Sequence, residues 1–465
     1  MLFPTGVFAI FLAVVSAVHW TLVRHAPGLV RHFLLCASLA FYAFWSATFC
    51  AALLVVGLFA WGIGLLAAQG RGAGWLRAGI AGALAWLFWF KYAGFAQREV
   101  ASALALLGLE APPALEVLLP VGVSFYVFQA ISYMVDVHRG HAVAARDPVD
   151  VLAYLTFFPH IAAGPIVRAA HFLPQLAMPP DARRVPCAMA LLLVAGGLFK
   201  KMVVANELAT GAVDPVFRDP SAHGAVDILL AAYGYTVQIW CDFSGYSDMA
   251  IGVAALLGYH FPRNFDQPFR ATSLSEFWRR WHISLSSWLR DYLYVPLGGS
   301  RGGALRTARN LLVTMVLGGI WHGANWTFLC WGALHGAALA AERFLPGLRA
   351  PPASPAATIL RWALTFHVVV ACFVLFRAPD LSTAAAMAAG LLEWTLPAEA
   401  ATPRLALLVA LGLGLHFVPG DLRLRLERAV SGLHPLALGA LAGAAALLIL
   451  SAGPEGVAPF IYFQF

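Results

Sequence analysis

Charged side chains are scarce in this chain. Only 11% of its 465 residues are Asp, Glu, Lys or Arg, and 61% are hydrophobic, whereas a soluble globular domain has roughly 25% charged residues. A surface this apolar would not be soluble in water, so the composition excludes an ordinary soluble protein and predicts that the lipid bilayer surrounds the chain. The net charge of +7 does not indicate nucleic-acid binding, because the basic residues lie in connections between apolar stretches, as the positive-inside rule expects.

Cysteine is sparse as well. The chain has six cysteines, scattered without a Cys-x-x-Cys pair, at positions 36, 50, 187, 241, 330 and 372. This pattern argues against a disulfide framework and against a metal site. We therefore expect no bound metal, and we expect the cysteines to be small buried apolar residues.

Long apolar runs dominate what is present. Several approach the ~20 residues that cross a membrane as a helix: about 2–23, 32–48, 50–69, 77–97, 117–135, 186–205, 226–261, 311–341, 358–376, 405–419 and 435–452. They are continuously apolar rather than alternating, which favours helices over a barrel. We predict an all-α polytopic membrane protein with about ten to twelve transmembrane helices, and a single integral-membrane domain over residues 1–465.

Two of these regions do not read as ordinary spans. Residues 156–165 are apolar but contain Pro159, Gly164 and Pro165, and a helix cannot run smoothly through them. Residues 311–341 would be about 46 Å long as one helix at 1.5 Å per residue. We predict a re-entrant or broken segment in the first region and a steep tilt or a break in the second, where Gly318, Gly319 and Gly323 offer the place.

Two histidines stand out because of their surroundings. His322 lies in residues 311–341, which carry no charged residue, and His282 comes 40 positions earlier. An ionisable side chain at membrane depth is a functional hypothesis by default, and histidine exchanges a proton near neutral pH. We interpret the pair as acid–base residues, with Trp321 and Asn325 as neighbours that could line the pocket. The simpler alternative is a structural histidine, which we expect for His335.

The segment around His282 is rich in arginine and aromatic residues. On a single helix over residues 275–294, His282 falls on the apolar side near Trp281, while Arg280 points elsewhere. Residues 263–309 hold eight arginines and three acidic residues, so we place this segment at the cytoplasmic face. The arginines serve as an orientation signal, with attraction of an anionic substrate as the alternative.

Further polar candidates lie beside apolar runs. His160 belongs to the broken segment and could line a cavity. Residues 242–248 form a polar island that includes Asp242, Ser244 and Asp248. Buried carboxylates need partners, so pairing with arginine is the simpler explanation and a place in the site is the alternative.

Four sequence blocks and the C-terminus carry a family resemblance. They are residues 158–168 (FPHIAAGPIVR), 242–252 (DFSGYSDMAIG), 280–293 (RWHISLSSWLRDYL), 321–324 (WHGA) and 460–465 (FIYFQF). Together they resemble the membrane-bound O-acyltransferase family, in the bacterial branch that contains the alginate O-acetylase membrane subunit. The blocks are long and in the expected order, so the resemblance covers essentially the whole chain.

The resemblance implies a ring of transmembrane helices around a central tunnel, in a multi-pass protein of the bacterial inner membrane. His322 matches the family's essential histidine, and His282 matches its second, upstream polar position. The implied co-substrate is a cytoplasmic acyl thioester, either acetyl-CoA or an acyl carrier, with no tightly bound cofactor. The implied partners are a polysaccharide acceptor such as alginate and separate periplasmic acetyltransferase proteins.

The chemistry of acyl transfer suits these residues. A hydroxyl that attacks a thioester must lose its proton, and a neutral imidazole can take it. We assign His322 as that base and His282 as the group that orients the donor or stabilises developing charge. D-alanyl transfer and peptidoglycan O-acylation remain alternatives within the family. A proton-coupled transporter and a non-catalytic membrane scaffold remain alternatives outside it.

Overall fold

The computed structural model confirms the predicted all-helical class. It describes residues 3–69, 72–113, 115, 117–161, 164–345, 347, 352–394, 398–452 and 461, and none of these forms a β-strand. The chain divides into two compact units, Met1–Pro186 with Val253–Pro262 and Cys187–Gly252 with Arg263–Phe465. That the two act as one membrane domain stays a prediction.

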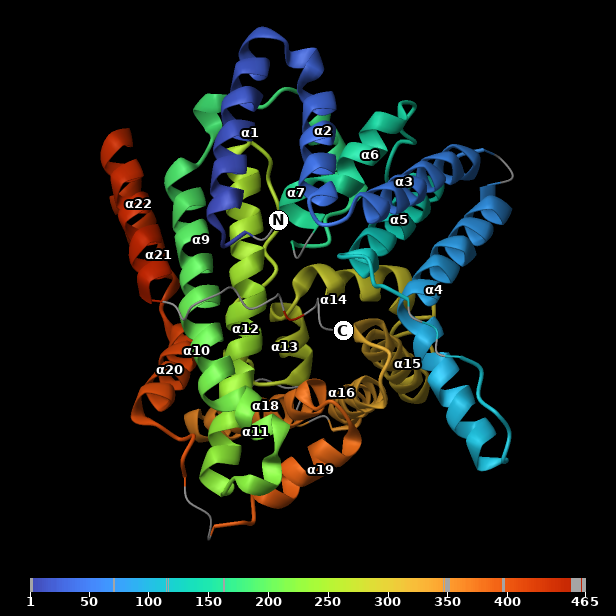
Figure 1. The fold of residues 1–465 in the computed structure, drawn as a ribbon, viewed down its shortest axis with the longest axis vertical. Helices are drawn as coiled ribbons and strands as arrows, with labels where there is room; N and C mark the ends of the chain where they lie inside the picture. The colour runs from blue at the N-terminus through green and yellow to red at the C-terminus, as the bar shows by residue number, and fades with distance from the viewer. Residues whose placement is uncertain are drawn as a thin grey trace. The chain divides into compact units, whose positions relative to one another are not determined.

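The first unit contains most of the helices drawn in blue and teal in Figure 1. Within it, α3 packs against α4, α5 and α6, and α2 packs against α6 and α7. Every residue of α5 from 123 to 137 is buried, so this helix forms the centre of the unit. Its elements are α1 (Gly6–His25), η1 (Pro27–Leu29), α2 (Val30–Ala43), α3 (Ala47–Ala67), α4 (Gly72–Leu106), α5 (Val123–His138), α6 (Pro148–Thr156), α7 (Phe158–Ile161), α8 (Ala169–Leu176) and η2 (Ala182–Arg184).

The second unit begins with a continuous helical run of α and π turns. The run comprises α9 (Cys187–Phe199), η3 (Lys200–Ala205), α10 (Asn206–Leu208), η4 (Ala209–Val213) and α11 (Asp214–Arg218). It is followed by η5 (Pro220–Ala222), α12 (Ala225–Leu256), η6 (Pro268–Arg270), α13 (Leu274–Arg280), α14 (Ile283–Leu289), η7 (Arg290–Tyr294), α15 (Ala304–His322) and α16 (Trp326–Phe344). The remaining elements are α18 (Pro355–Arg377), α19 (Leu381–Gly390), α20 (Pro403–Gly414), η8 (Leu415–Phe417), α21 (Gly420–Ser431) and α22 (Pro435–Ala452).

Helices α9 and α12 run side by side in Figure 1 and touch through glycines. A Cβ on Gly197 would lie 2.5 Å from the carbonyl oxygen of Gly245, and a Cβ on Gly245 would lie 2.8 Å from that of Gly197. Both distances are too short for a side chain, so only glycine permits this approach. The contact brings the lysines at the end of α9 onto the polar island of α12.

Five helical runs of the described chain are long and apolar enough to cross a membrane, or six if a bent pair counts as one span. The five are Gly6–His25, Ala47–Ala67, Gly72–Leu106, Cys187–Arg218 and Pro355–Arg377, and the bent pair is Pro403–Phe417 with Gly420–Ser431. Helix α12 has the length but carries three aspartates, and α15 and α16 have 19 residues each with charged ends. The chain is therefore polytopic, while the number of ten to twelve spans stays a prediction.

Both expected irregular regions are broken. In the first, α6 ends at Thr156 and only the four-residue α7 follows. In the second, α15 ends at His322 and α16 starts at Trp326, so the chain turns at Gly323. Gly318 and Gly319 are not break points, because they lie inside α15. A Cβ on Gly319 would meet the carbonyl oxygen of Phe328 at 2.2 Å, which shows that this glycine serves the close packing of α15 on α16.

The single helix expected over residues 275–294 is wrong. The chain leaves the helix after Arg280 and starts a new helix at Ile283. His282 between them has φ 42° and ψ 55°, a left-handed conformation that ends any continuous helix. The side-chain directions expected for one continuous helix over residues 275–294 therefore do not hold. Tertiary packing determines which of these side chains are buried.

Candidate functional site

His322 ends α15 in a closed aromatic setting. Its side chain is buried, with 3% of the residue exposed. The imidazole meets Trp331 of α16 at a ring-centroid distance of 4.9 Å, Phe376 of α18 at 5.0 Å and Trp321 at 5.0 Å, all nearly perpendicular. Three helices thus place aromatic faces and edges around one imidazole ring.

His282 is the second buried histidine of this unit, and its backbone is unusual. It has no exposed surface and is one of two non-glycine residues with positive φ in the described chain. Phe243 of α12 stands edge-on to its ring at 4.5 Å, and Phe265 lies nearly parallel at 6.4 Å. Backbone strain of this kind persists only where the surroundings over-determine it, and it clusters at functional sites.

Trp321 connects the two histidines. Its indole lies 6.4 Å from the ring of His282 and 5.0 Å from the ring of His322. The residue is 4% exposed, so it forms an internal wall between them. The structure therefore brings together the three residues on which the sequence-based hypothesis rests.

Asn264 is a site residue that the sequence analysis missed. Its side-chain oxygen lies 3.2 Å from Nδ1 of His282 and accepts hydrogen bonds from the backbone N–H and the hydroxyl of Ser284. Its side-chain nitrogen donates to Ser247 of α12. No local pattern pointed to this residue, because it lies 18 positions before the histidine in an irregular connection.

His335 belongs to a second aromatic layer behind Trp331. Its ring lies 4.8 Å from Trp331, 5.1 Å from Trp278 and 6.3 Å from Phe277, parallel to the last. It has no exposed surface. Among the described residues, neither of its ring nitrogens has a hydrogen-bond partner. These contacts agree with the packing role expected for this residue.

The polar island of α12 is neutralised by lysines, not by the arginines that were expected. Lys201 pairs with Asp242 at 2.5 Å, and both side chains are almost fully buried. Asp242 also accepts a hydrogen bond from the backbone N–H of Ile461. Lys200 pairs with Asp248 at 2.5 Å and donates to the hydroxyl of Ser244 at 2.9 Å. The C-terminal block 460–465 lies outside the described residues except for Ile461.

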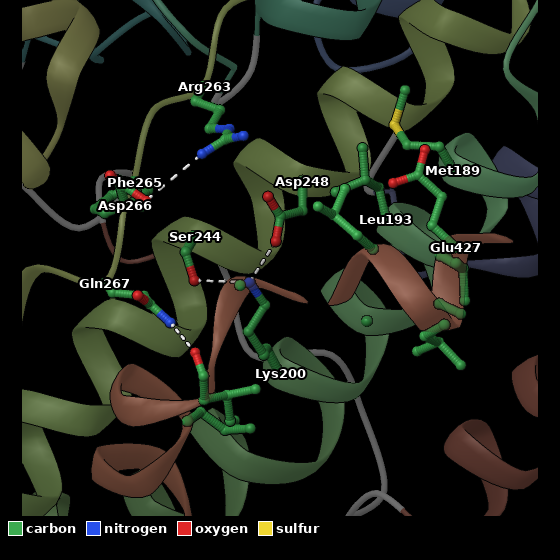
Figure 2. A pocket seen from close by; sticks show the side chains of 18 of the residues that line it. Met189, Leu193, Lys200, Ser244, Asp248, Arg263, Phe265, Asp266, Gln267 and Glu427 are labelled. Atoms are coloured by element: carbon green, nitrogen blue, oxygen red, sulfur yellow. Dashed lines mark hydrogen bonds and ion pairs between the residues drawn. The ribbon is translucent and has the colours of Figure 1, made fainter. Parts of the chain in front are cut away.

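A cavity of about 750 Å³ opens beside the more exposed of these pairs. Figure 2 shows Lys200 pointing to Ser244 and Asp248, with Met189 and Leu193 of α9 on another side. Phe265 lines the cavity and also stacks on His282. Ser244 and Asp248 line this cavity, and Asp242 is not among its lining residues; that any of the three belongs to the site stays a prediction.

Two other candidates, Asn325 and Trp281, have structural contacts. Asn325 caps α16 by accepting from the backbone N–H of Thr327 at 3.1 Å, and its nitrogen donates to the carbonyl of Pro379. Its position as a helix cap explains why it follows the turn at Gly323. Trp281 is buried and packs against Phe265, Phe269, Phe277 and Phe373.

Arg280 joins two acidic residues of the arginine-rich segment. Its guanidinium lies 3.0 Å from Glu276 and 3.4 Å from Asp266. Although burial alone would raise the pKa of Glu276, hydrogen bonds from Thr272 and Arg280 hold that pKa below its usual value. Arg280 thus ties α13 to the connection that precedes it.

His160 lies in the first unit and is 1% exposed. Its Nε2 is 3.2 Å from the side-chain nitrogen of Gln129, which also donates to the carbonyl of Val167. The rings of Phe157, Phe172 and Phe261 surround it. These contacts show a packed histidine that holds the broken segment against α5.

One motif of hydrolases also occurs in the chain. Gly298-Gly299-Ser300-Arg301-Gly302 matches Gly-x-Ser-x-Gly, in which hydrolases place the serine at a strand-to-helix turn. Here the motif follows η7, and Ser300 is exposed with its hydroxyl 3.2 Å from that of Tyr294. The geometry does not support a serine nucleophile. In the part of the chain that the structure describes, no three His, Cys, Asp or Glu side chains gather as metal ligands.

Comparison with known proteins gives a consistent result. A family model for the membrane-bound O-acyltransferase family (MBOAT) matches residues 34–378. The chain is 41% identical to the probable alginate O-acetylase AlgI of Azotobacter vinelandii over 85% of its length and 79% of that protein. It is 32% identical to the peptidoglycan O-acetyltransferase of Helicobacter pylori over 82% of its length and 77% of that protein. It is 27% identical to the teichoic acid D-alanyltransferase of Streptococcus thermophilus over 55% of its length and 68% of that protein.

Proposed function

Since the chain belongs to the membrane-bound O-acyltransferase family and is an O-acyltransferase, we propose that it moves an acetyl group from a thioester to a hydroxyl for the O-acetylation of an exported polysaccharide such as alginate. The similarity to proteins named alginate O-acetylase is higher and covers more of the chain than the similarity to the teichoic acid D-alanyltransferase. That ranking supports acetyl over D-alanyl transfer. Peptidoglycan as acceptor stays the second candidate, supported by 32% identity over 82% of the chain.

His322 acts as the general base in this proposal. Its imidazole takes the proton of the acceptor hydroxyl while the hydroxyl oxygen forms a bond to the thioester carbonyl carbon. The carbon–sulfur bond then breaks, the acetyl group stays on the oxygen, and the proton passes to the leaving thiolate. A positioned base typically contributes about 10²–10⁴-fold to such a step. The observation that carries this role is a buried histidine enclosed by Trp321, Trp331 and Phe376.

His282 orients the donor or stabilises the negative charge on the carbonyl oxygen. Both histidines contact Trp321, and this shared neighbour supports a second group close to the same reacting centre. A hydrogen-bond donor placed where charge develops in the transition state lowers the barrier more in a site without water than in water. We assign the larger share of the rate to His322, because His282 requires an additional residue to hold it.

The direction of transfer follows from the charge distribution and the size of the connections. The donor is a cytoplasmic acyl thioester, either acetyl-CoA or an acyl carrier, and the arginine-rich segment 263–309 faces it. The protein resides in the bacterial inner membrane and passes the acetyl group outward to a periplasmic acetyltransferase partner. No tightly bound cofactor takes part in this scheme.

The decisive experiment measures acetyl transfer by purified protein with a radiolabelled thioester donor. His322→Ala should abolish transfer while the protein remains folded in detergent, and His282→Ala should lose most of it. His367→Ala is the matched control, because His367 is exposed on α18 and lies outside the aromatic enclosure. Transfer at the wild-type rate by His322→Ala would reject the catalytic assignment.

A further inference from the structure

We infer that Asn264 is a positioning residue that selects the tautomer of His282 and fixes the orientation of its ring. The inference rests on the proposed function, because it concerns how His282 is prepared for acyl transfer. Asn264 and His282 are both almost fully buried, at 1% and 0% exposure. Their side chains meet at 3.2 Å between Oδ1 and Nδ1.

The orientation of the Asn264 amide follows from its other contacts. The backbone N–H of Ser284 can only donate, and it points at the same oxygen, 3.2 Å away. The hydroxyl of Ser284 donates to that oxygen at 2.8 Å. On the other side, the amide nitrogen donates to the hydroxyl of Ser247 at 3.0 Å. A flipped amide would set its NH₂ group against a backbone N–H, so the oxygen must face His282.

An oxygen at this position determines which ring nitrogen carries the proton. Because an amide oxygen accepts only, Nδ1 of His282 must be the N–H that donates to it. In the neutral ring the lone pair then resides on Nε2. The fixed tautomer therefore leaves the lone pair on Nε2. Of the two roles proposed for His282, this fits orientation of the donor by accepting a hydrogen bond, because stabilisation of negative charge would need an N–H at that nitrogen.

Asn264 also holds the strained backbone of His282. Its carbonyl oxygen accepts from the backbone N–H of Ile283 at 2.9 Å. Ile283 directly follows His282, whose φ of 42° lies in the left-handed region. The side chain and the backbone carbonyl of Asn264 thus form hydrogen bonds to residues 282–284. The hydrogen bond from Asn264 to Ser247 connects this segment to α12. The ring cannot rotate without breaking this network.

An amide at this position differs from a carboxylate in its effect on charge. An aspartate would stabilise the imidazolium form, as a carboxylate does in a catalytic triad. The neutral amide orients the ring without favouring protonation. Phe243, Phe265 and Trp321 contact the ring of His282, and none of these three side chains titrates in the physiological range.

Many titratable groups lie on the elements that pack around His282. On α12 the acidic groups Asp242 and Asp248 are paired with lysines, and Arg280 of α13 is paired with Glu276 and Asp266. The others on these elements and their connections are Asp227, Tyr233, Tyr235, Cys241, Tyr246, Tyr259, His260, Arg263, Arg270, Arg279, Arg290, Asp291, Tyr292, Tyr294, Arg301, Arg306, Arg309 and His322.

The test compares Asn264→Asp with wild type over a range of pH. Aspartate keeps an oxygen acceptor toward Ser284 and Nδ1, and the Ser247 hydroxyl can turn to donate to it, so the fold should persist. The carboxylate should raise the pKa of His282, which must be neutral to act. The acidic limb of the kcat/KM profile should therefore move to higher pH by about 1–3 units. Asn264→Ala should lower kcat more than it raises KM.

Asn310→Asp is the matched control. Asn310 lies on α15, is buried to the same extent as Asn264, and donates to the carbonyl of Gly299. Its aspartate variant should show the wild-type pH profile. An Asn264→Asp protein with the wild-type profile would overturn the inference, because a purely structural asparagine would not change the titration of the reaction.

A second measurement does not depend on the folding of any Asn264 variant. Nitrogen NMR of histidine-labelled protein in lipid, with the spectrum of His282→Gln subtracted, isolates the ring of His282. A protonated Nδ1 is expected, and a protonated Nε2 would overturn the inference. If His322→Ala and His282→Ala retain acetyl transfer, the proposed function fails. If both lose it and the ring shows the other tautomer, only the inference about Asn264 fails.

Discussion

His322 and Trp331 meet edge to face, with ring centroids 4.9 Å apart at 85°. The same indole also contacts His335 at 4.8 Å. One tryptophan of α16 therefore contacts both a histidine proposed to be the base and a histidine expected to pack. Because both histidines are buried in aromatic surroundings, replacing each in turn by phenylalanine separates a chemical role from a packing role.

The first prediction compares phenylalanine at the two positions. His322→Phe keeps the ring volume but removes the base, so acetyl transfer should fall at least 10²-fold, the lower end of general-base contributions. His335→Phe keeps the packing against Trp278 and Trp331 and should retain most of the activity. Rates are measured on purified proteins of equal thermal stability. A large loss in His335→Phe alone would reverse the two assignments.

A second prediction concerns the crossing of α15 and α16. Gly319→Ala would place a methyl group 2.2 Å from a backbone oxygen of Phe328, which cannot move aside. Overpacking of this kind typically costs about 1–3 kcal/mol, and it would displace the helix that carries His322. We expect a lower melting temperature and reduced transfer in detergent-solubilised protein.

Gly318→Ala is the matched control for that crossing. Its methyl group would meet only a flexible side-chain carbon of Leu289 at 3.3 Å. Stability and activity should stay close to wild type. Equal melting temperatures for the two alanine variants would contradict the close helix contact at Gly319.

A third prediction uses the adjacent lysines. Lys201→Met leaves the carboxylate of Asp242 without its buried ion pair, and removal of one partner of a buried pair costs about 3–5 kcal/mol. Lys200→Met should cost less, because that pair is more exposed, with side chains at 13% and 31% against 2% and 4%. Thermal unfolding followed by size-exclusion chromatography measures both. The double variant Lys201→Met with Asp242→Leu should recover part of the loss, whereas no recovery would argue against a desolvated charge as the cause.

A fourth prediction addresses orientation. The excess of arginine in residues 263–309 predicts that this segment faces the cytoplasm. Ser300 is exposed and accepts a cysteine in a background without native cysteines. An impermeant maleimide should label Ser300→Cys only after the membrane is opened. Labelling from outside intact spheroplasts would reverse the topology.

A fifth prediction concerns the partner. The longest connection of the chain, about 262–308, is assigned to the cytoplasm, so little surface remains outside for a large polysaccharide. Purified protein in liposomes with acetyl donor inside and alginate outside should acetylate the polymer poorly unless a periplasmic acetyltransferase is added. Liposomes with a His322→Ala protein provide the background. Efficient acetylation without a partner would place the acceptor site in this chain itself.

Local patterns in the sequence were sufficient for the class of the protein, and they singled out two histidines whose catalytic roles stay predictions. Continuous apolar runs predict helices in a bilayer because the backbone must satisfy its own hydrogen bonds there. Pro159 predicted a break for a similarly local reason, and the chain does break between α6 and α7. His322 and His282 stood out because an ionisable group is rare in such surroundings, and the structure buries both in contact with Trp321.

Only the tertiary structure decided how those residues are held. The left-handed turn at His282 is hydrogen-bonded to Asn264. Asp242 forms an ion pair with Lys201 and not with an arginine. Gly319 looked like a helix break but is a packing contact, and Asn325 looked like a pocket residue but caps a helix. In each case the partner is outside the few residues over which propensity acts. Which helices touch, and therefore which polar groups meet, is determined by packing of the whole chain and not by any local stretch of it.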